Sequence, residues 1–162
     1  MHEVIDNFFE ENYFRQIQKI FIEQPSPIPW FYIHKMNYNH TDNDYDCMFE
    51  HLVYENVKNS ELYELFTPLY DLLDIKSLIR IKFNLYPHKD SLVVHSKHKD
   101  YDFRHKGAII SINTCDGFTL LSDGSKIKSV ENRILLFDPS TEHASTNTTN
   151  AKARFNINVN YF

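Results

Sequence analysis

Three His-x-Asp pairs are the residues of this sequence with the most recognisable chemistry. They are His40-Thr41-Asp42, His88-Lys89-Asp90 and His98-Lys99-Asp100. Side chains two residues apart on an extended chain point the same way, so both members of a pair can reach the same metal ion. Two histidines and one carboxylate on one face of an octahedral iron ion leave three positions open, which suits oxygen activation. Such a site needs a second histidine from elsewhere in the chain.

The surroundings of each pair favour the third one. His40 lies in the polar stretch NHTDND, and His88 follows Tyr86-Pro87 in an expected turn. His98 instead follows the apolar run LVVH and precedes the apolar segment GAIISIN. A second histidine, His143, comes 43 residues after Asp100, directly behind ILLFDPS. The sequence therefore predicts a metal site made by His98, Asp100 and His143.

Arg154 follows His143 by eleven residues and lies in the alternating C-terminal segment RFNINVNYF. A guanidinium held in place can bind a carboxylate through two parallel hydrogen bonds. Together with the three metal ligands, Arg154 predicts an anion-binding position beside the metal.

The second half of the chain has the period-two pattern of β-strands. In RIKFNLY, polar residues alternate with apolar ones, and RFNINVNYF repeats the pattern. We predict strands over residues 80–86, 91–95, 107–113, 118–121, 126–130, 133–138, 142–146 and 154–162. The polar faces of the first and last of these strands either meet water or line the mouth of a barrel.

The first half shows helical spacing instead. Apolar residues recur at i, i+3 and i+4 in three segments, which predicts amphipathic helices over 3–22, 44–57 and 61–73, the last interrupted at Pro68. A strand is expected over 30–38. Helices followed by seven or eight short strands predict a mainly β (α+β) jelly roll with N-terminal helices packed on one sheet.

Length and composition indicate one domain over residues 1–162, with 1–79 as a mostly helical support layer and 80–162 as the core of the jelly roll. The 162 residues are 42% hydrophobic, which excludes wholesale disorder. No apolar run is long enough to span a membrane. The acidic N-terminus does not resemble a signal peptide, and two cysteines fit a reducing cytosol, so we expect a cytoplasmic protein.

Charge is divided unevenly along the chain. Residues 1–74 carry 14 acidic and 4 basic side chains, a balance of −10, whereas residues 75–162 carry 8 and 13, a balance of +5. This asymmetry indicates either a binding surface or an acidic helical layer beside a basic sheet.

Residues 80–162 resemble the 2-oxoglutarate- and Fe(II)-dependent oxygenases of the prolyl 4-hydroxylase-like type, most of all the compact members encoded by bacteriophages. The resemblance covers about half of the chain, and its parts occur in the family's order. The matching segments are NLYP (84–87), HSKHKD (95–100), IISINT with CDGFTLLSDG (109–124), ENRILLFD (131–138), EHAST (142–146) and RFNINVNYF (154–162).

The resemblance implies a double-stranded β-helix that uses Fe(II), 2-oxoglutarate as cosubstrate and O2, and releases succinate and CO2. By position, His98, Asp100 and His143 match the iron ligands, and Arg154 matches the residue that binds the distal carboxylate of 2-oxoglutarate. Three further residues match positions that line the cosubstrate or substrate: Tyr86, Asn158 and Asn160. Some relatives carry a second cosubstrate tyrosine where this chain has Ser111.

The resemblance also implies a protein or peptide substrate hydroxylated at proline. The alternative is a nucleic acid, nucleotide or small molecule, and the basic second half favours a nucleic acid or nucleotide among these. Nucleic-acid dealkylases of this superfamily usually carry another arginine after the one that binds 2-oxoglutarate, but Arg154 is the last basic residue here. A third interpretation is an inactive jelly roll that only binds a partner. A phage-encoded enzyme would work in the host cytoplasm.

The other polar residues have simpler interpretations. We expect His88 and His105 to be solvated loop residues, and His95 to be packed or on the surface. Cys115 is expected to be an unreactive thiol. The stretch STNTTN (145–150) predicts a polar hairpin loop.

Overall fold

The computed structural model describes residues 1–23, 26, 28–34 and 47–162 and contains two β-sheets. The strands are β1 (Glu3–Ile5), β2 (Phe31–Ile33), β3 (Met48–Glu55), β4 (Val57–Lys58), β5 (Leu78–Pro87), β6 (Lys106–Ser111), β7 (Phe118–Leu121), β8 (Lys126–Lys128), β9 (Arg133–Phe137), β10 (His143–Ala144) and β11 (Ala153–Tyr161). The large sheet has the order β1-β9-β6-β11-β5-β3-β2, with β4 beside β3, and the small sheet has the order β10-β7-β8.

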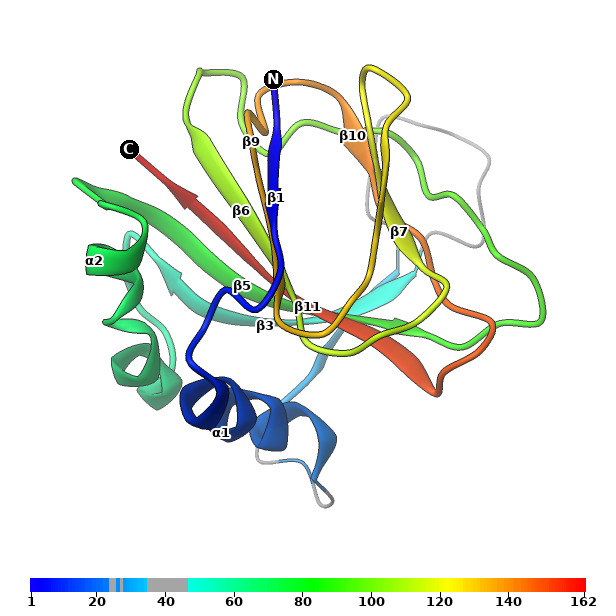
Figure 1. Ribbon diagram of the computed structural model, residues 1–162, viewed down its shortest axis with the longest axis horizontal. Helices are drawn as coiled ribbons and strands as arrows, with labels where there is room; N and C mark the ends of the chain where they lie inside the picture. Colours follow the sequence, from blue (N-terminus) through cyan, green and yellow to red (C-terminus); the bar gives the residue numbers. More distant parts are fainter. Residues whose placement is uncertain (24–25, 27, 35–46) are drawn as a thin grey trace.

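The helices are α1 (Glu11–Ile22), the 3-10 helix η1 (Glu61–Phe66) and α2 (Leu69–Leu72). Helices α1 and α2 lie on one side of the large sheet, away from β7 and β10 (Figure 1). This arrangement is a double-stranded β-helix, and it confirms the predicted mainly β jelly roll with N-terminal helices on one sheet. Among the described residues, no helix combines the length and apolar content that crossing a membrane would require.

The main core lies between the helices and the large sheet. Helix α1 contributes Phe14, Ile17 and Phe21, whose spacing places them on one helical face. They meet Phe83 of β5 and Ile157 of β11, among others, and the rings of Phe21 and Phe83 are 4.7 Å apart. A smaller apolar cluster of Ile109, Leu121, Leu135 and Phe137 joins strands of the two sheets.

Strand β11 has two faces with different surroundings. Its apolar residues, such as Ile157 and Val159, belong to the helix-side core. The alternate residues Asn156 and Asn158 line a cavity between the sheets and are only 2% and 7% exposed. Of the two environments that the sequence left open for this polar face, the structure shows the interior of the barrel.

The helix predicted over 44–57 is wrong, because residues 48–55 of this segment form strand β3. Two features conceal the strand in the sequence. The pairing of β3 with β5 shifts register between Leu52 and Tyr54, which breaks the period of two. In addition, the polar His51 occupies a buried position, where its ring nitrogens contact the Pro29 carbonyl and the Ser60 hydroxyl at 3.1 and 2.9 Å.

Other boundaries differ less. The segment 3–22 starts with β1 and becomes helical only at Glu11, and 61–73 divides into η1 and α2 around Pro68, as expected. Residues 91–95 make a single bridge, from Val94 to Thr146, instead of a strand. The strand expected over 30–38 is β2 at 31–33, and residues 35–38 lie outside the described residues.

The polar hairpin loop predicted for 145–150 is wrong. Ser145 to Thr148 are at most 7% exposed, and Thr146 and Thr148 bridge to Val94 and His88. The segment is polar because its side chains make internal hydrogen bonds; Asn147, for example, binds main-chain groups of Ser91 and Val93.

Candidate metal centre

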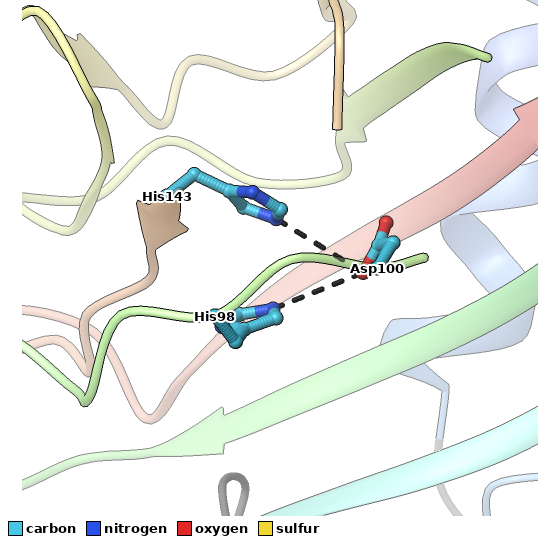
Figure 2. Close-up of side chains that lie close together, drawn as sticks. All are labelled: His98, Asp100 and His143. Carbon is cyan, nitrogen blue, oxygen red and sulfur yellow. Dashed lines mark ion pairs between the residues drawn. The ribbon is translucent and has the colours of Figure 1, made fainter. Parts of the chain in front are cut away.

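His98, Asp100 and His143 come together in space (Figure 2), and all three line the cavity. One Asp100 carboxylate oxygen lies 3.8 Å from His98 Nε2 and 4.0 Å from His143 Nε2. The three possible ligand atoms all lie within 4.8 Å of one another. Metal bonds to histidine nitrogen and carboxylate oxygen are about 2.0–2.2 Å long, so one ion fits among these atoms after a small closure.

The main chain fixes this grouping. His98 and His143 form an antiparallel bridge in which each backbone N–H donates to the other residue's carbonyl at 2.9 Å. The Asp100 N–H donates to the Pro139 carbonyl at 3.0 Å. The two segments that carry the ligands are therefore joined by backbone hydrogen bonds immediately beside the site.

Both histidines present Nε2 toward the centre. His143 Nδ1 lies 3.0 Å from the Thr141 carbonyl, and His98 Nδ1 lies 3.5 Å from the Ser96 carbonyl. A carbonyl oxygen requires a donor, which places the hydrogen on Nδ1 and leaves the Nε2 lone pair for a metal. Burial, together with the neighbouring His143, lowers the pKa of His98 to about 4, which keeps this ring neutral at neutral pH.

Two further side chains hold the Asp100 carboxylate. Arg80 Nη2 forms an ion pair with one oxygen and the Asn158 amide donates a hydrogen bond to the other, each at 3.1 Å. Burial by itself raises the pKa of Asp100, but the charge of Arg80, the two histidines and the Asn158 hydrogen bond outweigh it and lower the pKa well below its usual range. Asp100 is thus an oriented, ionised candidate ligand.

Arg154 is a buried cation without a carboxylate partner among the described residues. It is 1% exposed, and its two terminal nitrogens donate to the Thr146 carbonyl at 3.1 Å and the Thr119 hydroxyl at 3.0 Å. Its Nε has no hydrogen-bond partner. Burial lowers the pKa of Arg154, because the folded protein gives the charge little compensation. A buried charge is costly unless it is paired, so this guanidinium is suited to an anionic ligand.

The cavity beside the metal centre has a volume of about 450 Å³ and is lined by mostly polar side chains. Tyr86 and Thr119, both neighbours of Arg154, line it. Lys82 lines it too and pairs with Glu50 at 3.1 Å. Burial lowers the pKa of Lys82, and the nearby Arg80 charge acts in the same direction. Arg154 itself lies behind this lining.

The structure brings together the residues that the sequence analysis selected. The Arg154 guanidinium lies over the Tyr86 ring, with its carbon 5.4 Å from the ring centroid. The two residues are also register partners of the neighbouring strands β5 and β11. Asn158 lines the cavity and also binds Asp100. Asn160 is fully buried and binds Asn158. Ser111, at the position where some relatives carry a tyrosine, pairs in register with Asn156.

Of the two competing His-x-Asp pairs, the structure describes only the second. His88 and Asp90 are exposed, as expected for a loop, and do not belong to this site; residues 40–42 lie outside the described residues. His95 is 3% exposed, in agreement with packing. The prediction for His105 is wrong: it is 5% exposed, and its Nε2 contacts Asn160 Oδ1 at 3.1 Å. The polar partner that allows this burial lies 55 residues away in the sequence.

The sequence analysis missed three charged residues of the site: Arg80, Lys82 and Glu50. The alternation in RIKFNLY does place Arg80 and Lys82 on the same face as Tyr86. That pattern could have identified both as cavity residues. Glu50 could not be found in this way, because the segment around it has the spacing of a helix.

The sequence matches no protein-family model and no curated protein. Solved structures do show a similar fold. A 2OG-Fe(II) oxygenase family oxidoreductase from Burkholderia pseudomallei superposes with a TM-score of 0.71 at 11% identity, over 99% of this chain and 84% of its own. A Trichoplax adhaerens prolyl hydroxylase, in complex with a peptide fragment of hypoxia inducible factor, superposes with a TM-score of 0.70 at 16% identity, over 99% of this chain and 83% of its own.

A third similar structure is SnoN, a non-heme alpha-ketoglutarate-dependent epimerase from nogalamycin biosynthesis. Its TM-score is 0.66 at 11% identity, over 99% of this chain and 77% of its own. The three proteins differ in the reactions that their names state, and their identities to this chain are low. What the comparison establishes is therefore the fold: this chain has a double-stranded β-helix, which the three solved structures share.

Proposed function

We propose that this protein is an Fe(II)- and 2-oxoglutarate-dependent oxygenase. The observation that carries the proposal is the buried Arg154 guanidinium, which has no carboxylate partner among the described residues and contacts the lining of the cavity that contains His98, Asp100 and His143. Three metal-ligating side chains alone would fit many chemistries. Beside a buried arginine without a carboxylate partner among the described residues, they fit an anionic cosubstrate that binds both the metal ion and the arginine.

In this proposal, His98 and His143 hold iron through Nε2, and Asp100 holds it through a carboxylate oxygen. Bound iron with 2-oxoglutarate and O2 supplies an oxidative decarboxylation to succinate and CO2 that is coupled to oxidation of the substrate. Arg154 binds the distal carboxylate of 2-oxoglutarate, with Tyr86 and Thr119 forming the wall around it. The protein contributes placement of the reactants and exclusion of water.

The proposed substrate is a protein or peptide, oxidised at proline. The resemblance of residues 80–162 to prolyl 4-hydroxylase-like enzymes supports this choice, and one protein of similar fold is a prolyl hydroxylase in complex with a peptide. The Lys82–Glu50 pair at the cavity lining offers both charges to a substrate. A nucleic acid or small molecule is the alternative to be tested beside it.

Anaerobic titration of the purified protein with Fe(II) and then 2-oxoglutarate tests the metal and cosubstrate assignment. We expect an iron-to-cosubstrate charge-transfer band in the visible spectrum that is absent from Asp100→Ala. Asp90→Ala is the matched control, since Asp90 belongs to the exposed His-x-Asp pair and should leave the band intact. A folded, iron-supplied wild-type protein without the band would contradict the proposal.

Succinate formation tests the substrate class. Proline-containing peptides should raise succinate production above the background without substrate, and mass spectrometry should detect a 16 Da increase in the peptide. Single-stranded oligonucleotides and small-molecule mixtures form the comparison. Stimulation by oligonucleotides alone would transfer the proposal to the nucleic-acid alternative and remove the peptide assignment.

A further inference from the structure

A chain of buried hydrogen bonds connects Asp100 to a histidine outside the metal centre. The Asn158 amide donates to Asp100 at 3.1 Å, and the Asn160 amide donates to Asn158 Oδ1 at 2.9 Å. Asn160 Oδ1 in turn lies 3.1 Å from His105 Nε2. Asn158, Asn160 and His105 are 7%, 0% and 5% exposed, so water does not readily replace any of these bonds.

The direction of each bond in this chain is fixed from the carboxylate outward. An ionised carboxylate only accepts, so Asn158 must turn its NH2 toward Asp100 and its oxygen away. Arg80 Nη2, at 3.4 Å from that oxygen, requires the same orientation. Asn160 must then donate to Asn158 and present its own oxygen to the imidazole. His105 therefore has to carry a hydrogen on Nε2.

The surroundings of His105 hold the ring in this position. Its Nδ1 lies 2.8 Å from the Phe103 carbonyl, and the rings of Tyr101 and Phe103 lie 5.4 and 5.3 Å away. Both ring nitrogens thus face oxygen atoms, and both contacts are satisfied when each nitrogen carries a hydrogen. The charged groups nearby are Asp138 and Arg104, whose side chains pair at 3.6 Å.

We propose that His105 is a positioning residue for the metal ligand Asp100. By donating its Nε2 hydrogen to Asn160, it keeps Asn160 and Asn158 oriented so that the Asn158 amide occupies one Asp100 oxygen. The other oxygen, which Arg80 also contacts, stays directed at the two histidines. The inference rests on the proposed function in one respect, the role of Asp100 as a metal ligand.

The first test needs no metal. Nuclear magnetic resonance of protein labelled with 15N-histidine reports which ring nitrogens carry hydrogen. We expect the His105 Nε2 of the metal-free wild-type protein to be protonated. A ring with hydrogen on Nδ1 alone would overturn the inference, whether or not the protein proves to be an oxygenase.

The second test measures Co(II) affinity by titration in two variants. His105→Gln places an amide NH2 near the position of Nε2 and can still donate to Asn160, whereas His105→Leu cannot donate. Removing an outer partner of a metal ligand typically costs about 10–100-fold in metal affinity. We expect His105→Leu to raise the Co(II) Kd about tenfold, and His105→Gln to restore most of the loss.

Thermal unfolding of the same samples separates positioning from general stability. Equal Co(II) affinity in His105→Leu and wild type, or equal losses of affinity in both variants, would contradict a role through the hydrogen bond. If His105→Leu does not fold, the resonance experiment and His105→Gln still decide, because a protonated Nε2 and a retained affinity are both required. A wild-type protein that binds no Co(II) would instead refute the proposed metal centre.

Discussion

Replacing Arg154 with methionine separates ligand binding from stability more sharply than any other change in the site. Methionine keeps an unbranched chain in the buried space and removes the charge. Burial lowers the pKa of Arg154, which means that the charged guanidinium is less stable in the folded protein than in the unfolded chain. Arg154→Met removes this cost, and 2-oxoglutarate binding loses its proposed cationic partner.

The contacts of Arg154 give the size of each effect. A guanidinium has five N–H donors; the protein uses two of them, for Thr146 and Thr119, which leaves three for a ligand. A bidentate carboxylate takes two, each contributing about 1.5–3 kcal/mol, so the loss is about 3–6 kcal/mol, or about 10²- to 10⁴-fold in Kd. The free energy of unfolding falls by about 1–3 kcal/mol because the Thr146 carbonyl loses its hydrogen-bond donor. Removal of a buried charge raises it again and offsets this loss.

Calorimetric titration of 2-oxoglutarate into Mn(II)-loaded protein measures the first effect, and urea unfolding of the metal-free protein measures the second. We expect Arg154→Met to bind 2-oxoglutarate at least 100-fold more weakly and to unfold at a urea concentration no lower than wild type. Arg133→Met is the matched control. Arg133 pairs with Asp6 at the protein surface, so its loss should cost less than about 1 kcal/mol and leave ligand affinity unchanged.

Two results would refute the reasoning. A 2-oxoglutarate Kd in Arg154→Met within threefold of wild type would remove Arg154 from the binding site. A decrease of several kcal/mol in the free energy of unfolding would mean that the guanidinium is well compensated in the folded protein, contrary to the contacts described above.

The close packing of Gly117, the hydrogen-bonded carboxylate of Asp116 and the buried ring of Phe83 each predict a measurable change. In Gly117→Ala the new Cβ would lie 2.6 Å from Arg154 Cδ, so 2-oxoglutarate should bind at least tenfold more weakly by calorimetry; Gly124→Ala, at an open position with φ 86°, should cost stability only. Burial raises the pKa of Asp116, but hydrogen bonds from residues 148–150 lower it to about 2. The stability that Asp116 contributes is therefore present above the unfolded pKa near 3.8 and is lost as the pH falls toward 2, and Asp116→Asn should flatten this part of a urea midpoint-versus-pH curve. Phe83→Ala should lower the free energy of unfolding by about 3–5 kcal/mol in urea, because the ring is fully buried.

Each of these predictions has an outcome that contradicts it. Unchanged 2-oxoglutarate affinity in Gly117→Ala would show that Arg154 can move without loss of the ligand. An acid-unfolding curve of Asp116→Asn that overlays wild type would show that the Asp116 hydrogen bonds are equally strong in both protonation states. A loss below about 1 kcal/mol in Phe83→Ala would mean that the core refills the space.

The sequence predicted the elements whose patterns are local and failed where long-range contacts decide. Strands β5 and β11 alternate cleanly, because one face meets the helix-side core and the other a polar cavity. Strand β3 has a register shift and a buried His51, so its side chains imitate a helix. The buried position of residues 145–148 depends on partners near residue 91, which no local pattern reveals.

The candidate site was predictable to a similar extent. His98 and Asp100 share a short motif, and the alternation in RFNINVNYF puts Arg154 and Asn158 on one face. The contact of Arg80 with Asp100 depends on how β5 lies relative to the segment after residue 95, which is a tertiary property. His105 looked like a solvated residue for the same reason, since Asn160 satisfies it from the far end of the chain.

The two-faced strand β11 also determines which mutations this protein can tolerate. Substitutions on its inner face can alter what the cavity accepts without disturbing the core under the helices. A single inserted or deleted residue within the strand is different, because it would exchange the two faces from that point on. Arginine and asparagine side chains would then enter the hydrophobic core, and isoleucine and valine would enter the cavity. We therefore expect this strand to vary among related proteins by point substitution and to keep its length.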